Sequence, residues 1–220
     1  VEILSNKDMF RSFLKENNFN VPQAKGYATL GEAIVDFHTF TMPVMVKPTD
    51  SSGSRGISKI NSIELLPEKV EYALSYSREK RFIIEEYVER QGYQIGGECF
   101  FVNGKLAFSR LVNNHFETKS FNPFLPTGES WPCILPTHLQ EKIHVEIQRL
   151  MNLLNMKTGP LIFEVIVDYK ENVYILDIGV RNSGDLTQVI EHVEGIDLIG
   201  YTIKASLAED CSGLKMVEPS

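Results

Sequence analysis

Residues 42–60 constrain the fold of this chain more than any other stretch of its sequence. An apolar run, Val44–Val46, is followed by Lys47, then by a loop rich in serine and glycine, and then by a second short apolar run that ends at Ile60. The pattern predicts a strand, a loop and a second strand. The P-loop and the dinucleotide-binding fingerprint both open a helix instead, and neither motif occurs in this sequence.

The loop between these two predicted strands has the composition of an anion-binding site. Backbone N–H groups of such a loop can point inward, and glycine lets the main chain approach phosphate oxygens closely. Lys47 and Arg55 add positive charge. A protein kinase has its glycine-rich loop before the lysine and carries His-Arg-Asp and Asp-Phe-Gly, which are absent here. The residues predict a triphosphate cradle, and a flexible hairpin of small polar residues is the alternative.

Composition bounds the class of protein. The chain has 220 residues, of which 43% are apolar, enough for one large domain or two small ones. Its net charge of −7 argues against a nucleic-acid surface, so a phosphate ligand needs a local cluster such as Lys47, Arg55 and Lys59. There is no run of 18 apolar residues and no signal-like start, so no membrane partner is expected. Three scattered cysteines favour reduced thiols and a cytoplasmic protein.

The first part of the chain is predicted to alternate between helices and strands. Ser5 with Asp8, and Thr29 with Glu32, resemble capping boxes at the starts of two helices. Pro67 fits a third helix only in its first turn. Helices are expected at about 5–17, 29–37 and 62–75, and strands at 44–47, 56–60 and 81–88.

Two hairpins are predicted in the second part of the chain. Asn103-Gly104 between the apolar runs 94–102 and 105–112 is the strongest short-range signal for a hairpin. Residues 113–136, with four prolines, are expected to form a long ordered loop of the kind that often carries function. Further on, the pattern predicts a long helix from Pro136 that ends before Gly159-Pro160, a hairpin of strands 162–169 and 172–178, and helices at 186–192 and 196–208.

The second hairpin brings two acids together if its turn has two or four residues. In either case Glu164 faces Asp177 across the strands. Adjacent carboxylates repel each other unless a cation neutralises them. A few carboxylates, completed by water and phosphate oxygens, are the usual ligands of Mg²⁺. A turn of three residues would shift the register and leave two unrelated acids on a half-exposed sheet. Arg181 and Lys47 are cations suited to the same polyphosphate.

Several motifs occur in one order over most of the chain: Asn6-Lys7 in the opening helix, Val46-Lys47-Pro48 with its loop, the strand 83–88, Glu164, and Asp177-x-x-x-Arg181. With these motifs the chain resembles the ATP-grasp superfamily, nearest to its carbamoyl-phosphate-synthase-like and carboxylate–amine ligase members. The resemblance implies an α+β fold, with two α+β lobes and the nucleotide bound between their sheets. Residues 1–25 are then a leading helix and linker, 26–88 the small lobe, and 89–220 the large lobe with the metal-binding hairpin.

The resemblance also implies roles for the residues that match the family's motifs. Lys47 contacts the ATP phosphates, and Arg181 lies near the transferred phosphate, so these two are the expected catalytic residues. Glu164 and Asp177 match the ligands of Mg²⁺ or Mn²⁺, and Glu98 matches an acid that meets the ribose hydroxyls. The remaining nucleotide-binding positions are Lys7, the loop Ser51, Ser52, Gly53, Ser54, Arg55 and Gly56 that folds over the phosphates, and the hinge Glu85, Glu86, Tyr87 and Val88 that holds adenine through its backbone.

The sequence departs from the family in two places. The family often has Glu-x-Asn-x-Arg where this chain has an aspartate at position 177 and Gly179, so the usual asparagine ligand is missing. Asn182 and Asp185 are candidates to compensate for it. The second departure is that no α/β domain precedes the opening helix. The chain is therefore expected to be a fragment, with part of the acceptor site in a missing N-terminal domain.

The expected activity is that of an ATP-dependent carboxylate–amine ligase. MgATP phosphorylates a small-molecule carboxylate, and an amine or another nucleophile then attacks the acyl phosphate. A homodimer is compatible with this reading, and nucleic acid is not an expected partner. The alternative, motivated by Gly179, is a non-catalytic nucleotide-binding or scaffolding module of the same fold. Scattered histidines and cysteines give no support to a zinc site or to a Ser-His-Asp or Cys-His mechanism.

Overall fold

The structure is a computed structural model that describes residues 2–214, and the chain divides into two units. The first unit holds the chain up to Arg90 together with His115–Gly128. The second holds Gln91–Asn114 and the chain from Glu129 onward. Residues 115–128 were expected in the second lobe and 1–25 as a separate leading segment, whereas both segments group with the first unit.

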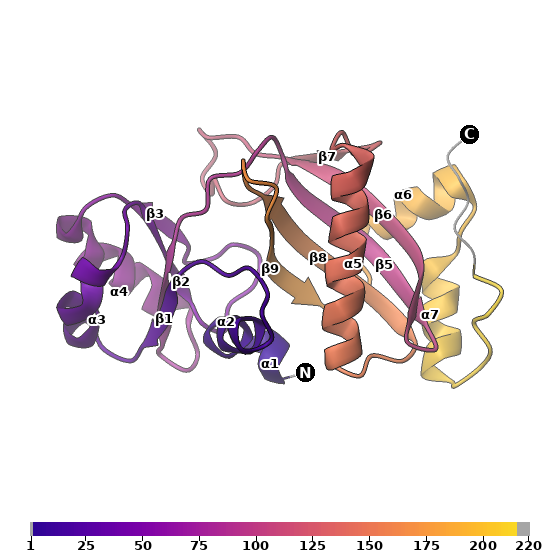
Figure 1. Ribbon diagram of the computed structural model, residues 1–220, viewed down its shortest axis with the longest axis horizontal. Helices are drawn as coiled ribbons and strands as arrows, with labels where there is room; N and C mark the ends of the chain where they lie inside the picture. The colour runs from indigo at the N-terminus through magenta and orange to yellow at the C-terminus, as the bar shows by residue number, and fades with distance from the viewer. Residues whose placement is uncertain (1, 215–220) are drawn as a thin grey trace. The chain divides into compact units, whose positions relative to one another are not determined.

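The first unit is built on a four-stranded sheet with the order β1-β4-β2-β3, in which all neighbouring strands are antiparallel (Figure 1). Both halves of the predicted strand–loop–strand lie in this sheet, as β2 and β3. The elements are α1 (Glu2–Ser5), α2 (Lys7–Glu16), β1 (Ala24–Tyr27), α3 (Leu30–Asp36), the 3-10 turn η1 (Phe37–Thr39), β2 (Val44–Pro48), β3 (Ser58–Ile60), η2 (Ile63–Leu65), α4 (Leu66–Tyr76) and β4 (Phe82–Glu86).

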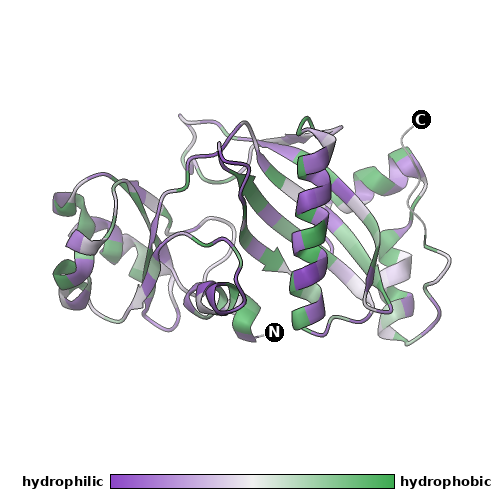
Figure 2. Ribbon diagram, viewed as in Figure 1, coloured by the Kyte–Doolittle hydropathy of each residue, from purple (hydrophilic) through white to green (hydrophobic). Residues whose placement is uncertain are grey.

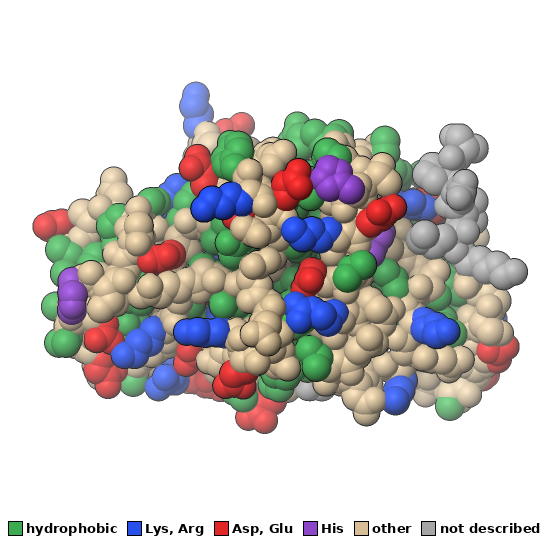
Figure 3. Space-filling view, viewed as in Figure 1, with side chains coloured by type: hydrophobic (Ala, Val, Ile, Leu, Met, Phe, Trp, Pro, Cys, Tyr) green, Lys and Arg blue, Asp and Glu red, His purple; other side chains and the backbone are tan. Residues whose placement is uncertain are grey.

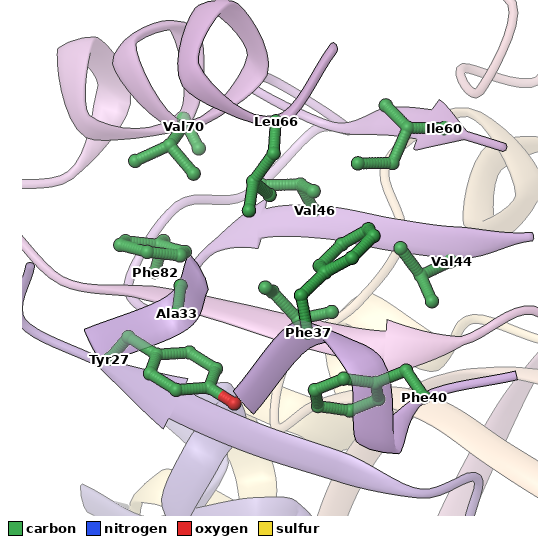
Figure 4. Close-up of a cluster of buried hydrophobic side chains, with 12 residues drawn as sticks. Tyr27, Ala33, Phe37, Phe40, Val44, Val46, Ile60, Leu66, Val70 and Phe82 are labelled. Atoms are coloured by element: carbon green, nitrogen blue, oxygen red, sulfur yellow. The ribbon is translucent and has the colours of Figure 1, made fainter. Parts of the chain in front are cut away.

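One face of this sheet carries the core of the first unit. Val44 and Val46 alternate along β2, and both are fully buried beside Leu66 and Val70 of α4 (Figure 4). Burying each such side chain contributes about 1.5–3 kcal/mol. Because alternate residues of a strand point to opposite faces, the side chain of Lys47 lies on the face opposite this core.

The predicted start of one helix was confirmed, and the predicted start of another was wrong by one residue. Thr29 and Glu32 form the expected capping box at the start of α3. The cap of α2 is Asn6, whose side chain accepts hydrogen bonds from the N–H groups of Asp8 and Met9. Asn6 has an extended backbone conformation, which divides the single predicted helix into α1 and α2.

The second unit contains a five-stranded sheet with the order β7-β6-β5-β8-β9. Ser109 of β6 is hydrogen-bonded to His144 of α5, whereas the adjacent Phe108 packs with α6 and α7, so helices cover both faces. Figure 1 shows α5 crossing one face, and Figure 2 shows how its apolar and polar residues alternate. The elements are β5 (Gln94–Val102), β6 (Lys105–His115), β7 (Gly128–Ser130), α5 (Thr137–Leu153), β8 (Gly159–Val167), β9 (Val173–Gly179), α6 (Asp185–Glu194) and α7 (Leu198–Ser206).

Both predicted hairpins are present. Asn103 and Gly104 join β5 to β6 with φ angles of 51° and 79°, the positive values that a two-residue type I′ turn requires. The β8–β9 turn has three residues, because the Asp168 N–H donates to the Asn172 carbonyl, so the predicted turn of two or four residues was wrong. The Gly159-Pro160 pair opens β8 instead of only following the preceding helix.

A β-bulge restores the register that the three-residue turn shifts. Val165 pairs with Ile175, one residue out of the predicted register, but the ladder shifts between Glu164 and Val165. Leu176 is the extra residue on β9. Glu164 therefore pairs with Asp177, as predicted, although the turn differs from the one assumed.

No helix within residues 2–214 is long and apolar enough to cross a membrane. On the face shown in Figure 3, basic and acidic side chains are interspersed. That face therefore shows no broad basic surface of the kind that binds nucleic acid.

Candidate functional site

Lys47 lies in a buried ion-pair network of the first unit. Its Nζ is 2.8 Å from Oε2 of Glu85, on the neighbouring strand β4. Arg11 of α2 approaches the other carboxylate oxygen, with 3.2 Å between its Nε and Oε1 of Glu85. The side chains of Glu85 and Arg11 are 2% and 4% exposed, so almost no water screens these charges. The carboxylate therefore holds the Lys47 amine in place.

Three cations act on the carboxylate of Glu85. Burial alone would raise the pKa of Glu85, but the charges of Arg11 and Lys47, the hydrogen bond from Lys47 and the charge of Lys7 outweigh it and lower the pKa to about 2. Three cations thus stabilise the charged form of this one buried carboxylate.

The loop after β2 has three residues with left-handed backbone conformations. Gly53 and Gly56 have φ angles of 66° and 74°, and Ser54 between them has 54°. A Cβ at Gly56 would lie 3.1 Å from Cγ of Pro48. Both this close contact and the positive φ angle favour glycine at position 56. Nζ of Lys7 donates to the carbonyl of Ser51 at 2.6 Å and anchors the start of the loop.

The outer part of the loop is exposed. Ser52 and Arg55 lie at the surface, where Arg55 Nε donates to the carbonyl of Ser52 at 3.1 Å. Five consecutive predicted phosphate-binding positions make up this segment, and Lys47 lies near the end of the preceding strand. Those five positions are Ser52, Gly53, Ser54, Arg55 and Gly56.

Part of the predicted hinge already makes hydrogen bonds within the first unit. The Glu86 N–H donates to the carbonyl of Gln23, and the Tyr87 N–H donates to the carbonyl of Pro43, both at 2.9 Å. The carboxylate of Glu86 accepts from the N–H of Thr41 at 2.7 Å. The Tyr87 ring lies under the amine of Lys59, 3.4 Å from the ring centre.

The two acids of the second unit lie on one face of its sheet, as neighbours across β8 and β9. Oε2 of Glu164 accepts a hydrogen bond from Nε2 of Gln94 at 3.0 Å, and Asp177 Oδ1 accepts from the N–H of Ile178 at 2.9 Å. Gly96 pairs with Glu164 on the third strand, β5. Asn114 leans over that glycine, because a Cβ there would lie 2.8 Å from its Oδ1.

Asn114 Oδ1 is a buried acceptor that the fold does not use. Asn114 is 3% exposed, and within residues 2–214 its Oδ1 has no hydrogen-bond partner. The pairing of Asn114 with Gln94 places it on the same face as Glu164. The structure therefore gathers two carboxylates, one amide donor and one unsatisfied amide oxygen on this face.

Glu98 has a structural environment that does not match the predicted ribose contact. It is fully buried, and its carboxylate oxygens accept hydrogen bonds from Nδ2 of Asn182 at 3.0 Å, from Oγ of Ser183 at 2.9 Å and from Oγ1 of Thr187 at 2.7 Å. These donors belong to the start of α6 and the segment before it. A carboxylate satisfied in this way anchors that segment and is not presented to a sugar.

Arg181 and Gly179 lie near the same segment. Arg181 is exposed and donates from Nη1 to the carbonyl of Asn182 at 2.9 Å. Gly179 pairs with Ile162, and a Cβ there would approach Cγ1 of Ile162 to 2.8 Å. Ile162 therefore occupies the space that a side chain at position 179 would need. Asn182 is engaged with Glu98, so it is not placed as a substitute for the missing asparagine.

No group of three or more His, Cys, Asp or Glu side chains suited to a metal occurs in the described part of the chain. Glu164 and Asp177 alone do not make up such a group, so a hard cation held there would need further oxygen ligands. A cavity of about 400 Å³ lies elsewhere in the first unit, at β1 and α3, and Lys47 is not part of its lining. Lys25, which lines this cavity, is paired with Asp36.

Sequence reasoning missed Arg11, Gln94 and Asn114. Arg11 lies in an amphipathic helix, and it is paired with Glu85, which is distant in the sequence. Gln94 opens a predicted strand, where polar residues are common. The one available signal for Asn114 was its place at the border between a strand and the proline-rich loop.

Comparison with known proteins gives one family. The model of the ATP-grasp domain matches residues 40–189. The chain is 22% identical over 217 residues to the carbamoyl phosphate synthase large chain of Thermoanaerobacter sp. (strain X514), covering 95% of this chain but 19% of that protein. It is 26% identical over 213 residues to the D-alanine–D-alanine ligase of Parabacteroides distasonis, covering 93% of this chain and 63% of the ligase.

A solved structure shares the fold. The biotin carboxylase domain dimer of the Hydrogenobacter thermophilus 2-oxoglutarate carboxylase, in complex with MgADP, ADP and bicarbonate, superposes with a TM-score of 0.79 at 16% identity. The match covers 97% of this chain and 48% of that one. The chain thus spans less than two thirds of each of these three relatives.

Proposed function

Because this chain belongs to the ATP-grasp family, we propose that it is the nucleotide-binding part of an ATP-dependent ligase that activates a carboxylate as an acyl phosphate for attack by an amine or another nucleophile. Relatives that match most of the chain include a D-alanine–D-alanine ligase and a carbamoyl phosphate synthase. They support the reaction class and leave the carboxylate and the nucleophile open.

The cluster of Lys47, Lys7 and Arg11 around Glu85 carries the proposal. Lys47 and Lys7 are the two amines beside the Ser/Gly loop that can meet phosphate oxygens, while Arg11 and Glu85 keep Lys47 oriented. In phosphoryl transfer, positioning and neutralising the phosphate charge supply most of the catalysis. Lys47 therefore has a role in binding and in stabilising the transferred phosphate. We assign a similar charge-neutralising role to Arg181.

The residues of the second unit fit a magnesium ion. Glu164 and Asp177 supply two hard carboxylate oxygens, and Asn114 Oδ1 is an unsatisfied oxygen on the same face. Mg²⁺ commonly takes one or two carboxylates and completes its shell with water and substrate phosphates. Bound Mg²⁺ would neutralise phosphate charge. Gln94 holds Glu164 in place for that role, and Mn²⁺ suits the same oxygens.

Further parts of the proposal concern the protein around this chain. We take the first unit, up to Arg90 with His115–Gly128, as the leading segment and small lobe, and the second unit as the large lobe. We infer a preceding α/β domain that contributes to the acceptor site, a cytoplasmic location, and small-molecule substrates. A homodimer is consistent with the biotin carboxylase domain dimer that shares the fold. A non-catalytic nucleotide-binding module is the second candidate, because Ile162 excludes a side chain at Gly179.

ATP binding and ADP release test the proposal together. The wild-type protein, in its longest natural form, is titrated with MgATP by calorimetry and then screened for ADP release against amino acids and sugar acids. Lys47→Ala should weaken MgATP binding by about 1–3 kcal/mol, the scale for losing one charge-assisted contact. Glu164→Gln should abolish the Mg²⁺ dependence of nucleotide binding while the fold remains intact.

The outcomes separate the two candidate functions. ADP release that depends on an added carboxylate supports the ligase. MgATP binding without ADP release under any acceptor supports the non-catalytic module. Equal ATP binding by the wild type and Lys47→Ala would contradict the phosphate-binding assignment itself.

A further inference from the structure

Residues 115–128 form a loop that belongs to the first unit, although the chain on either side of it belongs to the second. The N–H of Thr127 donates to the carbonyl of His115 at 2.8 Å, which closes the base of the loop. We call residues 115–128 the bracing loop. Its tip is at the surface, where Phe121 is fully exposed.

Two side-chain hydrogen bonds join the bracing loop to the Ser/Gly loop. Oγ of Ser54 donates to the carbonyl of Phe124 at 2.8 Å, and Nδ2 of Asn122 donates to the carbonyl of Ser54 at 3.1 Å. Asn122 is itself oriented, because its Oδ1 accepts from the N–H of Phe124 at 3.1 Å. Ser54 is thus held both by its side chain and by its main chain.

Ser54 is the residue of the Ser/Gly loop that most needs such support. Its φ of 54° lies in the left-handed region, which residues with a side chain rarely adopt. Gly53 and Gly56 reach similar angles without steric cost. The directions of the N–H groups in this segment depend on these dihedral angles, and an anion binds more tightly to N–H groups that are already aligned.

We propose that Asn122 is a positioning residue for the phosphate chain of the nucleotide: acting through Ser54, it fixes the Ser/Gly loop in the conformation that receives the phosphates. The inference rests on the proposed function and extends it to a segment outside the loop itself. Asn122 reaches the ligand only through Ser54. Its removal should therefore affect ligands that carry phosphates and leave a nucleoside without phosphates unaffected.

Calorimetry with MgATP and with adenosine tests this selectivity. Asn122→Ala should weaken MgATP binding about three- to tenfold, the change expected for one net hydrogen bond, and leave adenosine binding unchanged. Asn122→Ser keeps an oxygen near the Phe124 N–H but is too short to reach Ser54, so it should behave as Asn122→Ala. Phe121→Ala, at the exposed tip of the same loop, is the matched control and should bind both ligands as the wild type does.

A double-mutant cycle and hydrogen exchange complete the test. Asn122→Ala and Ser54→Ala combined should weaken MgATP binding by less than the product of their separate effects, because both bonds support one conformation. In the protein without nucleotide, amides 51–56 should exchange faster in Asn122→Ala than in Phe121→Ala.

Several results would overturn the inference. Equal losses for MgATP and adenosine would show a general structural effect, wild-type behaviour of Asn122→Ser would assign the effect to the local turn, and unchanged MgATP binding by Asn122→Ala would remove the role altogether. The proposed function fails in a different way, through a wild-type protein that does not bind MgATP or through a Lys47→Ala variant that binds it equally well.

Discussion

Glu85 joins two cations that lie far apart in the sequence. Arg11 comes from α2 and Lys47 from β2, and both reach the same carboxylate in an interior with little solvent. In such a setting each charge depends on the others, since an unpaired buried ion is costly. The carboxylate thus has a structural role, keeping the fold intact, and in the proposed function it also orients the amine of Lys47.

The first prediction concerns the acid stability of this network. The folded protein lowers the pKa of Glu85 from 4.5 to about 2. The stabilisation is therefore complete above pH 4.5 and is lost as the pH falls from about 4.5 towards 2, a total of about 3 kcal/mol. Glu85→Gln should unfold more easily at pH 7, by about 3–5 kcal/mol, because Arg11 and Lys47 would lose their counter-charge.

Urea unfolding at pH values from 7 to 2.5 measures this effect. The wild type should lose stability between pH 4.5 and 2.5 more steeply than Glu85→Gln does. Glu89→Gln, which removes one exposed carboxylate of the first unit, is the matched control. Parallel curves for the wild type and Glu85→Gln would show that Glu85 does not carry the acid-sensitive stability.

The environment of a single residue could be predicted where its partners are close to it in the sequence. Lys47 and the glycines of the following loop stand next to each other in the sequence, so their grouping could be foreseen. Arg11 could not, because a lone arginine in an amphipathic helix is usually exposed. The sequence pointed to Glu98 as an acid near the nucleotide. Its hydrogen bonds with the segment at the start of α6 could not be foreseen, because they join residues more than 80 positions apart.

At the scale of elements, the β8–β9 hairpin shows how two local departures can cancel. The sequence predicted the facing acids from an assumed turn length, and the actual turn is one residue different. The bulge at Leu176 compensates for it. Turn length and bulges are not visible in an alternating pattern, because a shift of one residue changes which face each side chain occupies without changing the pattern's period.

The second prediction concerns Gly179 in this hairpin. Gly179→Asn, which restores the residue common in the family, should lower the free energy of unfolding by about 1–3 kcal/mol, because its Cβ meets Ile162. Combining it with Ile162→Ala should cost less than the sum of the two single changes. Denaturant unfolding gives all three values.

Gly128→Asn is the matched control for this prediction. A Cβ at Gly128 has no heavy atom within 4 Å, so the same change of residue should be nearly neutral there. If Gly179→Asn is as stable as the wild type, Ile162 moves aside easily and does not explain the glycine.

The third prediction concerns α5, whose His144 is hydrogen-bonded to Ser109 at 2.8 Å. Burial lowers the pKa of His144, against a smaller opposing effect of Glu141. The neutral ring is therefore favoured in the folded protein, and stability should fall as the pH drops below 6.5. His144→Gln, which keeps an acceptor for Ser109, should show a smaller loss between pH 7.5 and 5.5.

Thermal unfolding across that pH range provides the measurement. His192→Gln changes an exposed histidine on α6 and should follow the wild-type curve. A His144→Gln curve that also follows the wild type would mean that another group causes the acid sensitivity.

At the scale of the whole molecule, the fourth prediction uses the exposed tip of the bracing loop. Phe121 is fully exposed, so brief treatment with chymotrypsin should cut there early. The two fragments should remain together, because β5 and β8 pair within one sheet and belong to different fragments. The nicked protein should bind MgATP more weakly than the intact one, because the cut lies next to Asn122.

Gel filtration and calorimetry of the nicked protein test this expectation, and Phe121→Ala should resist the cut. Fragments that separate would contradict the role given to the β5–β8 pairing. Undiminished MgATP binding after cleavage would contradict the role given to the bracing loop.

The fold class was predicted well at this scale because several weak motifs agreed in order. The unit boundaries were harder to predict, since residues 115–128 return to the first unit after two strands of the second. A scan along the sequence favours continuous domains, and only contacts in three dimensions, such as that between Asn122 and Ser54, reveal an interrupted one.

The interrupted first unit limits how genes of this kind can be recombined. The chain passes from one unit to the other after Arg90, after Asn114 and after Gly128. A crossover near residue 90 would pair the Ser/Gly loop of one parent with the bracing loop of another. Chimeras made in that way should retain both folds yet lose the Ser54–Asn122 match. Exchanges that keep residues 51–56 and 115–128 from the same parent should therefore be the functional ones.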